Sequence, residues 1–134
     1  MKTIIMSFVV ALFLGVFLNI EPVFSETSEP LPAVIETELK VLGMCGMCKT
    51  RIERAAYSVR GVRSASWNQQ QQMLTVSYRT NRTDQETIER AIAEAGHDTE
   101  NFITDEETHA NLHHCCIYPR DPEMLKNNRL YNSD

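Results

Sequence analysis

Two cysteines lie three residues apart in the run GMCGMC, at Cys45 and Cys48. A deprotonated thiol is both a nucleophile and a soft metal ligand, so a Cys-x-x-Cys motif indicates either metal binding or thiol–disulfide exchange. Sulfur ligands favour Cu(I), Hg(II), Cd(II) or Zn(II) over hard ions. Two sulfurs alone suit Cu(I) or Hg(II), because zinc normally takes four ligands. We therefore expect a soft heavy-metal site with Cu(I) as its ion, and Hg(II) or Zn(II) as the alternatives.

The two cysteines fall between an expected strand and an expected helix. Residues 34–41 alternate apolar and polar side chains, which is typical of a half-buried strand. Residues 48–59 place apolar side chains at helical spacing, and Gly61 ends this helix. A helix start has unpaired N–H groups and partial positive charge, and both lower the pKa of a cysteine by stabilising its thiolate. This position therefore favours metal binding.

The following segments complete a small α+β domain. Strands are expected over 62–68 and 73–78, a helix over 84–96, and a fourth strand over 97–103. The order β-α-β-β-α-β over 34–104 predicts a ferredoxin-like α+β fold, with a four-stranded antiparallel sheet and two helices on one face.

The other segments of the chain are assigned to export and to connections. Residues 1–25 have a short basic start, a long apolar run and a small residue at the end, which is typical of a secretory signal peptide. Residues 26–33 are a Pro-rich linker, and 105–134 form a C-terminal extension whose end is expected to be disordered. We therefore expect an exported, periplasmic protein that meets a membrane only through the signal segment, if that segment is retained.

Charge and composition exclude two classes of function. The chain has a net charge of −5 at pH 7, and an acidic chain of this size is a poor nucleic-acid binder. The sequence offers no Ser-His-Asp or paired-carboxylate arrangement that would indicate catalysis. We expect a protein that is not an enzyme and does not bind nucleic acid.

The run GMCGMCKTRIE, the expected order of elements and the AGHD turn before the last strand together resemble the heavy-metal-associated domain family. The resemblance covers roughly residues 35–104. This family includes copper chaperones, metal-binding modules of copper-transporting ATPases and periplasmic mercury-binding proteins. The resemblance implies that Cys45 and Cys48 hold the ion, and that the partner is a metal-transporting membrane protein or another metal carrier. The HHCCIYPR segment is similar to a tail on exported members of the family.

The loop before the motif departs from the family pattern. The family has Gly-Met-Thr ahead of the first cysteine, and its Met packs beneath the metal loop. Alignment on the cysteines puts Gly43 at the Met position and Met44 at the Thr position. Either the loop is built differently, or Met44 turns toward the metal as an accessory ligand. Met47, between the two cysteines, is expected on the solvent side.

His97 is the next candidate for the site. It opens the expected fourth strand, which in this fold pairs antiparallel with the first strand. This places His97 at the same end of the sheet as Cys45. An imidazole there would act as a third ligand or as a hydrogen-bond partner of the site, and the alternative is an exposed loop histidine without a role.

Cys115 and Cys116 form a second pair of thiols. A direct exit from the fourth strand would leave them at the far end of the sheet from Cys45. A helix over 105–112, however, spans ~12 Å and would carry the chain back toward the first motif.

Three interpretations of this second pair stay open. It shares a thiolate site with the Cys-x-x-Cys motif, it forms a site of its own, or it is structural or disulfide-bonded in an oxidising compartment. A disulfide between the two neighbours themselves is disfavoured by its geometry. The histidines available to a separate site, or as accessory ligands, are His109, His113 and His114.

Three functions are compatible with these residues. A carrier would hold the ion at the Cys-x-x-Cys motif and pass it on by thiolate exchange. A metal-sensing module that docks on a membrane transporter would use the same site. A thiol–disulfide redox protein is the third possibility, but redox enzymes of the thioredoxin class need a proline loop facing the dithiol, and residues 33–118 contain no proline.

Overall fold

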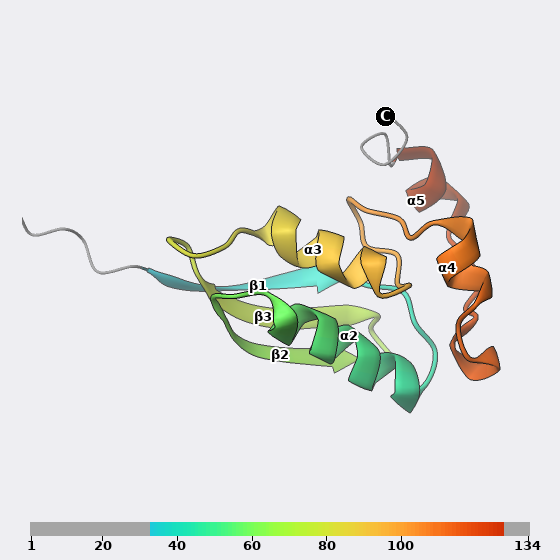
Figure 1. Cartoon of the computed structure of the whole chain (residues 1–134), viewed down its shortest axis with the longest axis horizontal. Helices are drawn as coiled ribbons and strands as arrows, with labels where there is room; N and C mark the ends of the chain where they lie inside the picture. Colours follow the sequence, from blue (N-terminus) through green and yellow to red (C-terminus); the bar gives the residue numbers. More distant parts are fainter. Residues whose placement is uncertain (1–32, 128–134) are drawn as a thin grey trace, which may run out of the picture.

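The computed structural model describes residues 33–127. The expected signal segment, nearly all of the linker and the last seven residues lie outside this range. Three strands, β1 (Val34–Lys40), β2 (Val62–Asn68) and β3 (Met73–Arg79), form an antiparallel sheet in the order β1-β3-β2 (Figure 1). Three of the four expected strands are therefore present.

Two helices cover one face of this sheet (Figure 1). α2 (Gly46–Ser58) packs against β2, and α3 (Gln85–Glu94) packs against α2. α3 begins at Asp84, whose carboxylate accepts a hydrogen bond from the Thr87 N–H at 2.8 Å and so satisfies one of the free donors of the first turn. The ferredoxin-like α+β class predicted from the sequence is confirmed.

The core lies between the sheet and the helices. It follows the periodicity of each element, because every second residue of a strand and every third or fourth residue of a helix points inward. Its fully buried members from the sheet and the helices include Ile52, Trp67, Leu74, Val76, Ile88 and Ile92.

The prediction of a fourth strand over residues 97–103 is wrong. The segment keeps a single antiparallel bridge, between Val41 and Thr99. The Leu42 N–H also donates to the Asp98 carbonyl at 2.9 Å, so the segment still lies beside the end of β1. It thus occupies the place of a fourth strand without forming one.

A turn that is held by side chains interrupts this strand. The Thr99 N–H donates to the Phe102 carbonyl at 2.7 Å, which folds the chain back at once. The buried carboxylate of Glu89 accepts hydrogen bonds from the Thr99 hydroxyl at 2.9 Å and from the Asn101 N–H at 3.2 Å. Such side-chain bonds offer the backbone an alternative to a strand ladder.

The C-terminal extension contains three short elements: α4 (Glu106–Ala110), the 3₁₀ turn η1 (His114–Cys116) and α5 (Pro122–Asn127). α4 lies at the end of the sheet where β1 ends and α2 begins (Figure 1), and η1 packs against α2. The extension shares the core of the domain through Leu112, Cys116, Tyr118 and Met124. Residues 34–104 and the described part of the extension therefore do not have separate cores.

Within residues 33–127, no helix combines the length and the apolar character that crossing a bilayer would require.

Candidate metal centre

Four free thiols meet at the start of α2, and Cys45 lies at their centre. The Cys45 Sγ atom is 3.4 Å from the Sγ of Cys48, 3.3 Å from that of Cys115 and 3.6 Å from that of Cys116. These separations are far longer than the ~2.05 Å of a disulfide bond. The fold thus brings the second pair of cysteines to the first, which is the arrangement of the shared-site interpretation.

Three of these sulfurs form a ready-made triangle for an ion. The ligand atoms of Cys45, Cys115 and Cys116 all lie within 4.8 Å of one another, and the Cys115–Cys116 Sγ distance is 3.9 Å. With sides of 3.3, 3.6 and 3.9 Å, the triangle has its centre about 2.1 Å from each sulfur, close to the ~2.3 Å of a zinc–thiolate bond. A small expansion of the triangle would admit a three-coordinate soft ion.

The position of Cys45 at the start of α2 favours its thiolate form. Burial raises the pKa of Cys45, but the hydrogen bond from the Cys48 N–H, together with bonds from the neighbouring thiols, outweighs burial and lowers this pKa to about 6. Cys45 is the N-cap residue of α2, so its side chain lies beside the first turn, whose N–H groups have no partner within the helix. The metal-free protein therefore carries a thiolate at Cys45 at neutral pH.

The two tail cysteines keep their protons in the metal-free protein. The pKa of Cys115 is raised because its thiol bonds to the sulfur of Cys45, and burial adds to this. Burial raises the pKa of Cys116, and bonds to Cys48 and Cys45 act in the same direction. A bound ion would replace these protons, since metals bind the deprotonated thiol.

The accessory residues divide into those near the sulfurs and those away from them. The Met47 Sδ atom lies 3.6 Å from the Cys115 Sγ, and the His113 Nδ1 atom lies 3.3 Å from the same sulfur. Met44 is exposed and reaches the cluster through its backbone, whose N–H donates to the Cys48 Sγ at 3.5 Å. The His114 ring lies against the His113 ring, at 4.1 Å between centroids and a tilt of 39°. Met47, rather than Met44, is thus the methionine beside the thiols.

His97 lies behind the metal loop rather than among the thiols. Its ring is fully buried, and its Nδ1 atom is 2.9 Å from the carbonyl oxygen of Leu42, three residues before Cys45. Its Nε2 atom has no hydrogen-bond partner among residues 33–127, and it does not belong to the group of convergent ligand atoms. Desolvation lowers the pKa of His97 to about 4, so the ring is neutral at pH 7. Its position fits a hydrogen-bond partner of the loop rather than a third ligand, and the alternative of an exposed histidine is wrong.

Two residues that the sequence did not single out hold the metal loop. The Gln72 side chain donates to the Gly43 carbonyl at 2.6 Å and accepts from the Gly43 N–H at 2.9 Å. Trp67 lies beneath the same residue, and its indole N–H donates to the Val41 carbonyl at 3.0 Å. Trp67 thus fills the space beside Gly43, where a side chain larger than that of glycine would be crowded. A run of four glutamines gives no sign of which one reaches the loop.

Glycine at position 43 is required by this packing, and we expect opposite results from alanine at two neighbouring glycines. A Cβ atom at Gly43 would lie 3.0 Å from the Cys48 Cβ and 3.1 Å from the Trp67 ring, whereas one at Gly46 would meet nothing within 4 Å. Gly43→Ala should cost about 1–3 kcal/mol by overpacking, and Gly46→Ala should stabilise α2 by about 0.5–1 kcal/mol. Chemical unfolding of the metal-free variants measures both. Equal effects of the same sign would contradict the packing argument.

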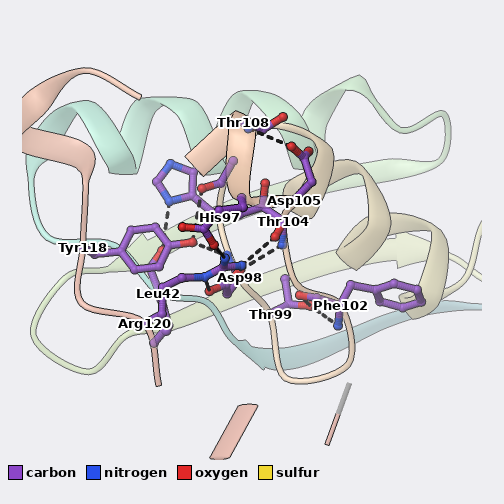
Figure 2. A network of polar contacts seen from close by, with 12 residues as sticks. Leu42, His97, Asp98, Thr99, Phe102, Thr104, Asp105, Thr108, Tyr118 and Arg120 are labelled. Atoms are coloured by element: carbon purple, nitrogen blue, oxygen red, sulfur yellow. Dashed lines mark hydrogen bonds and ion pairs between the residues drawn. The ribbon is translucent and has the colours of Figure 1, made fainter. Parts of the chain in front are cut away.

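A second polar network joins the extension to the domain at the corner formed by His97 and Asp98 (Figure 2). Arg120 forms a two-pronged ion pair with Asp98, at 2.9 Å from Nε and 2.8 Å from Nη2. The Tyr118 hydroxyl accepts a hydrogen bond from the Asp98 N–H at 2.6 Å and donates to the Gly96 carbonyl at 3.2 Å. These contacts link residues twenty or more positions apart, and no local pattern in the sequence indicates them.

Comparisons with known proteins find similarity over the part of the chain that carries the Cys-x-x-Cys motif. The family model described as heavy-metal-associated domain matches residues 38–98. The solved structure of the CopZ metallochaperone is 30% identical, with 48% of this chain and 98% of that chain covered and a TM-score of 0.47. A copper-binding domain from HMA7, a P-type ATPase, is 32% identical, with 48% and 89% covered and a TM-score of 0.47. Oxidised MerP from Ralstonia metallidurans is 24% identical, with 50% and 94% covered and a TM-score of 0.48. A search of curated proteins gives no match.

The matched residues contain the Cys-x-x-Cys motif and end at Asp98, so Cys115 and Cys116 lie beyond the family domain. The family is one of metal-binding domains rather than of enzymes, in agreement with the absence of a catalytic motif from the sequence. The thiol cluster supplies the soft ligands that such a domain needs. By its domain over residues 38–98, the chain belongs to the heavy-metal-associated domain family.

Proposed function

We propose that this protein carries one Cu(I) ion, held by Cys45 and Cys48 together with Cys115 and Cys116. The observation that carries this proposal is the meeting of four free thiols around the Cys45 sulfur, with three other sulfurs within 3.6 Å of it. Side-chain sulfur alone is a soft ligand set, which selects against Mg²⁺ and Ca²⁺.

The number of sulfurs bears on the choice between soft ions. Zinc takes four ligands in a tetrahedron, whereas only Cys45, Cys115 and Cys116, of the four thiols, place their sulfurs all within 4.8 Å of one another. Cys48 reaches this group through Cys45, at 3.4 Å between the two Sγ atoms. A three-sulfur group with a thioether at Met47 suits Cu(I), since thiolates and thioethers are its preferred ligands. Hg(II) and Zn(II) are the ions to compare with it.

A carrier function also requires a cellular location and a partner protein that gives or receives the ion. The signal-like start of the sequence supports a role outside the cytoplasm, in the periplasm. The partner would be a metal-transporting membrane protein or another metal carrier with a free cysteine. In the transfer step, the partner's thiolate forms a bond to the ion, and one bond between the ion and a cysteine of this chain then breaks. The ion stays Cu(I), because no electron moves.

Native mass spectrometry of the reduced protein with Cu(I), Hg(II) and Zn(II) tests this function. We expect one Cu(I) per chain, and loss of tight binding in the Cys45→Ser/Cys48→Ser variant. The Lys49→Gln variant is a control beside the motif, because it removes a charge and no sulfur. Equal Cu(I) binding by the wild type and the double variant would overturn the proposal. Reduction of insulin at the rate of a redox enzyme would favour the thiol–disulfide alternative instead.

A further inference from the structure

The thiols of the extension sit on a segment with few polar attachments of its own. The hydrogen bonds of residues 113–117, as far as residues 33–127 are concerned, run within the segment or between sulfurs. Before this segment, Leu112 packs closely against Gly96. After it, Tyr118 follows Cys116 with one residue between. The attachment of these neighbours therefore decides where Cys115 and Cys116 lie.

Tyr118 is held on three sides. Its hydroxyl group bonds to the backbone of Asp98 and Gly96, at 2.6 and 3.2 Å. Its ring stacks on His97 at 5.6 Å and meets His109 edge-on at 4.6 Å between centroids. The side chain is 4% exposed, so its hydroxyl has little access to water as an alternative partner.

Arg120 makes the second attachment. Its guanidinium is 13% exposed and pairs with the Asp98 carboxylate, which is 1% exposed. It also donates to the Thr104 carbonyl at 2.6 Å and pairs with Glu106 at 2.9 Å. A two-pronged pair has a fixed geometry, because both partners are planar. The chain is thereby fixed at two points, two and four residues after Cys116 (Figure 2).

The segment also covers the motif. Cys48 and Cys116 are fully buried, and Cys45 is partly buried. The Sγ atoms of Cys115 and Cys116 lie 3.3 and 3.6 Å from the Cys45 Sγ, and η1 packs against α2. The extension thus supplies thiols at the place where those of a partner would otherwise enter.

We propose that Tyr118 and Arg120 are positioning residues that latch residues 113–117 over the Cys-x-x-Cys motif, so that the ion is retained until this latch opens. The inference rests on the proposed function, since it concerns release of the same ion. On opening, the bonds from the ion to Cys115 and Cys116 break, and an incoming thiolate takes the place of one of them. The latch therefore slows release without being a ligand itself.

The rate of Cu(I) loss to an excess of a competing chelator tests the latch. Tyr118→Phe keeps the ring and removes the hydroxyl group, and we expect Cu(I) to leave about tenfold faster, because two hydrogen bonds to the backbone are lost. Tyr57→Phe removes a hydroxyl from an exposed tyrosine on α2 and should leave the rate unchanged. Arg120→Lys keeps the charge but loses the two-pronged geometry, and it should also speed release.

A background without the tail thiols separates positioning from general stability. In Cys115→Ser/Cys116→Ser, the Tyr118→Phe substitution should no longer change the rate, because nothing remains to be positioned. The ultraviolet charge-transfer spectrum of the Hg(II) form gives a second readout, changing from three thiolate ligands toward two when the latch is weakened. An unchanged rate in Tyr118→Phe, or the same acceleration in both backgrounds, overturns the latch. If the wild type binds no Cu(I), the proposed function itself has failed.

Discussion

Cys45→Ser is expected to weaken Cu(I) binding more than replacement of any other single cysteine. The Cys45 sulfur contacts all three other cysteine sulfurs, at 3.3 to 3.6 Å. It is also the thiol whose pKa is lowered, to about 6, so it is the one ready to bind at neutral pH. Loss of residues that merely orient a metal ligand costs about 10–100-fold in affinity, and loss of this shared ligand should exceed a hundredfold.

The other three cysteines provide the matched controls. Cys115→Ser leaves the Cys45–Cys48 pair, which can still hold Cu(I) between two sulfurs, and we expect a smaller loss of affinity. Competition with a Cu(I) chelator of known affinity, carried out on the four single variants, ranks them. Serine is close to cysteine in size, and circular dichroism checks that each variant is folded. If Cys115→Ser or Cys116→Ser weakened binding as much as Cys45→Ser, the central place of Cys45 would be wrong.

The metal-free protein should lose stability between pH 6.5 and pH 4 because of His97. The ordinary pKa of histidine is 6.5, and desolvation lowers the pKa of buried His97 to about 4. In this window the unfolded chain binds a proton that the folded protein does not, so the free energy of unfolding falls as the pH falls. Above pH 6.5 the full stability is present, and below pH 4 no more of it is lost through this group. The difference corresponds to roughly 3 kcal/mol.

Comparison of two histidine variants isolates this contribution. His97→Gln removes the titrating ring, so the part of the slope between pH 6.5 and pH 4 that belongs to His97 should disappear. His114→Gln is the matched control, because it removes an exposed histidine instead of a buried one. Urea unfolding at closely spaced pH values measures the slopes, and the comparison cancels the carboxylates that titrate in both variants. Identical slopes for all three proteins would contradict the burial of a neutral His97.

The elements with strong periodicity could be predicted from the sequence, because the spacing of apolar residues within each element shows which of its faces is buried. β2 was predicted with its observed limits, since its alternation ends at Asn68. The fourth strand failed for a non-local reason. Glu89, on α3, accepts hydrogen bonds from the backbone and the side chain of Asn101 and so interrupts the strand. The alternation of side chains within residues 97–103 gives no sign of this contact. α5 was not expected because Pro122, which can begin a helix, reads equally well as a break.

The Cys-x-x-Cys part of the site could be predicted from the sequence, whereas the contribution of the C-terminal extension could not be decided. Cys-x-x-Cys is a local pattern, and a helix start near it follows from the sequence alone. The return of Cys115 and Cys116 was one of three open interpretations, because it depends on how α4 turns the chain. The ion pair of Asp98 and Arg120 could not be predicted, since nothing local shows that charges 22 positions apart form a buried pair.

Cys116 belongs to two assemblies at once, because it is part of the apolar core and part of the thiol cluster. Core packing and ion binding therefore share an atom, and the thermodynamics of folding and of loading are linked through it. An ion that binds the native state alone adds its binding free energy to the unfolding of the whole unit. Cargo and chain thus form one cooperative system, in which a loaded molecule differs from an empty one in its resistance to unfolding as well as in what it carries.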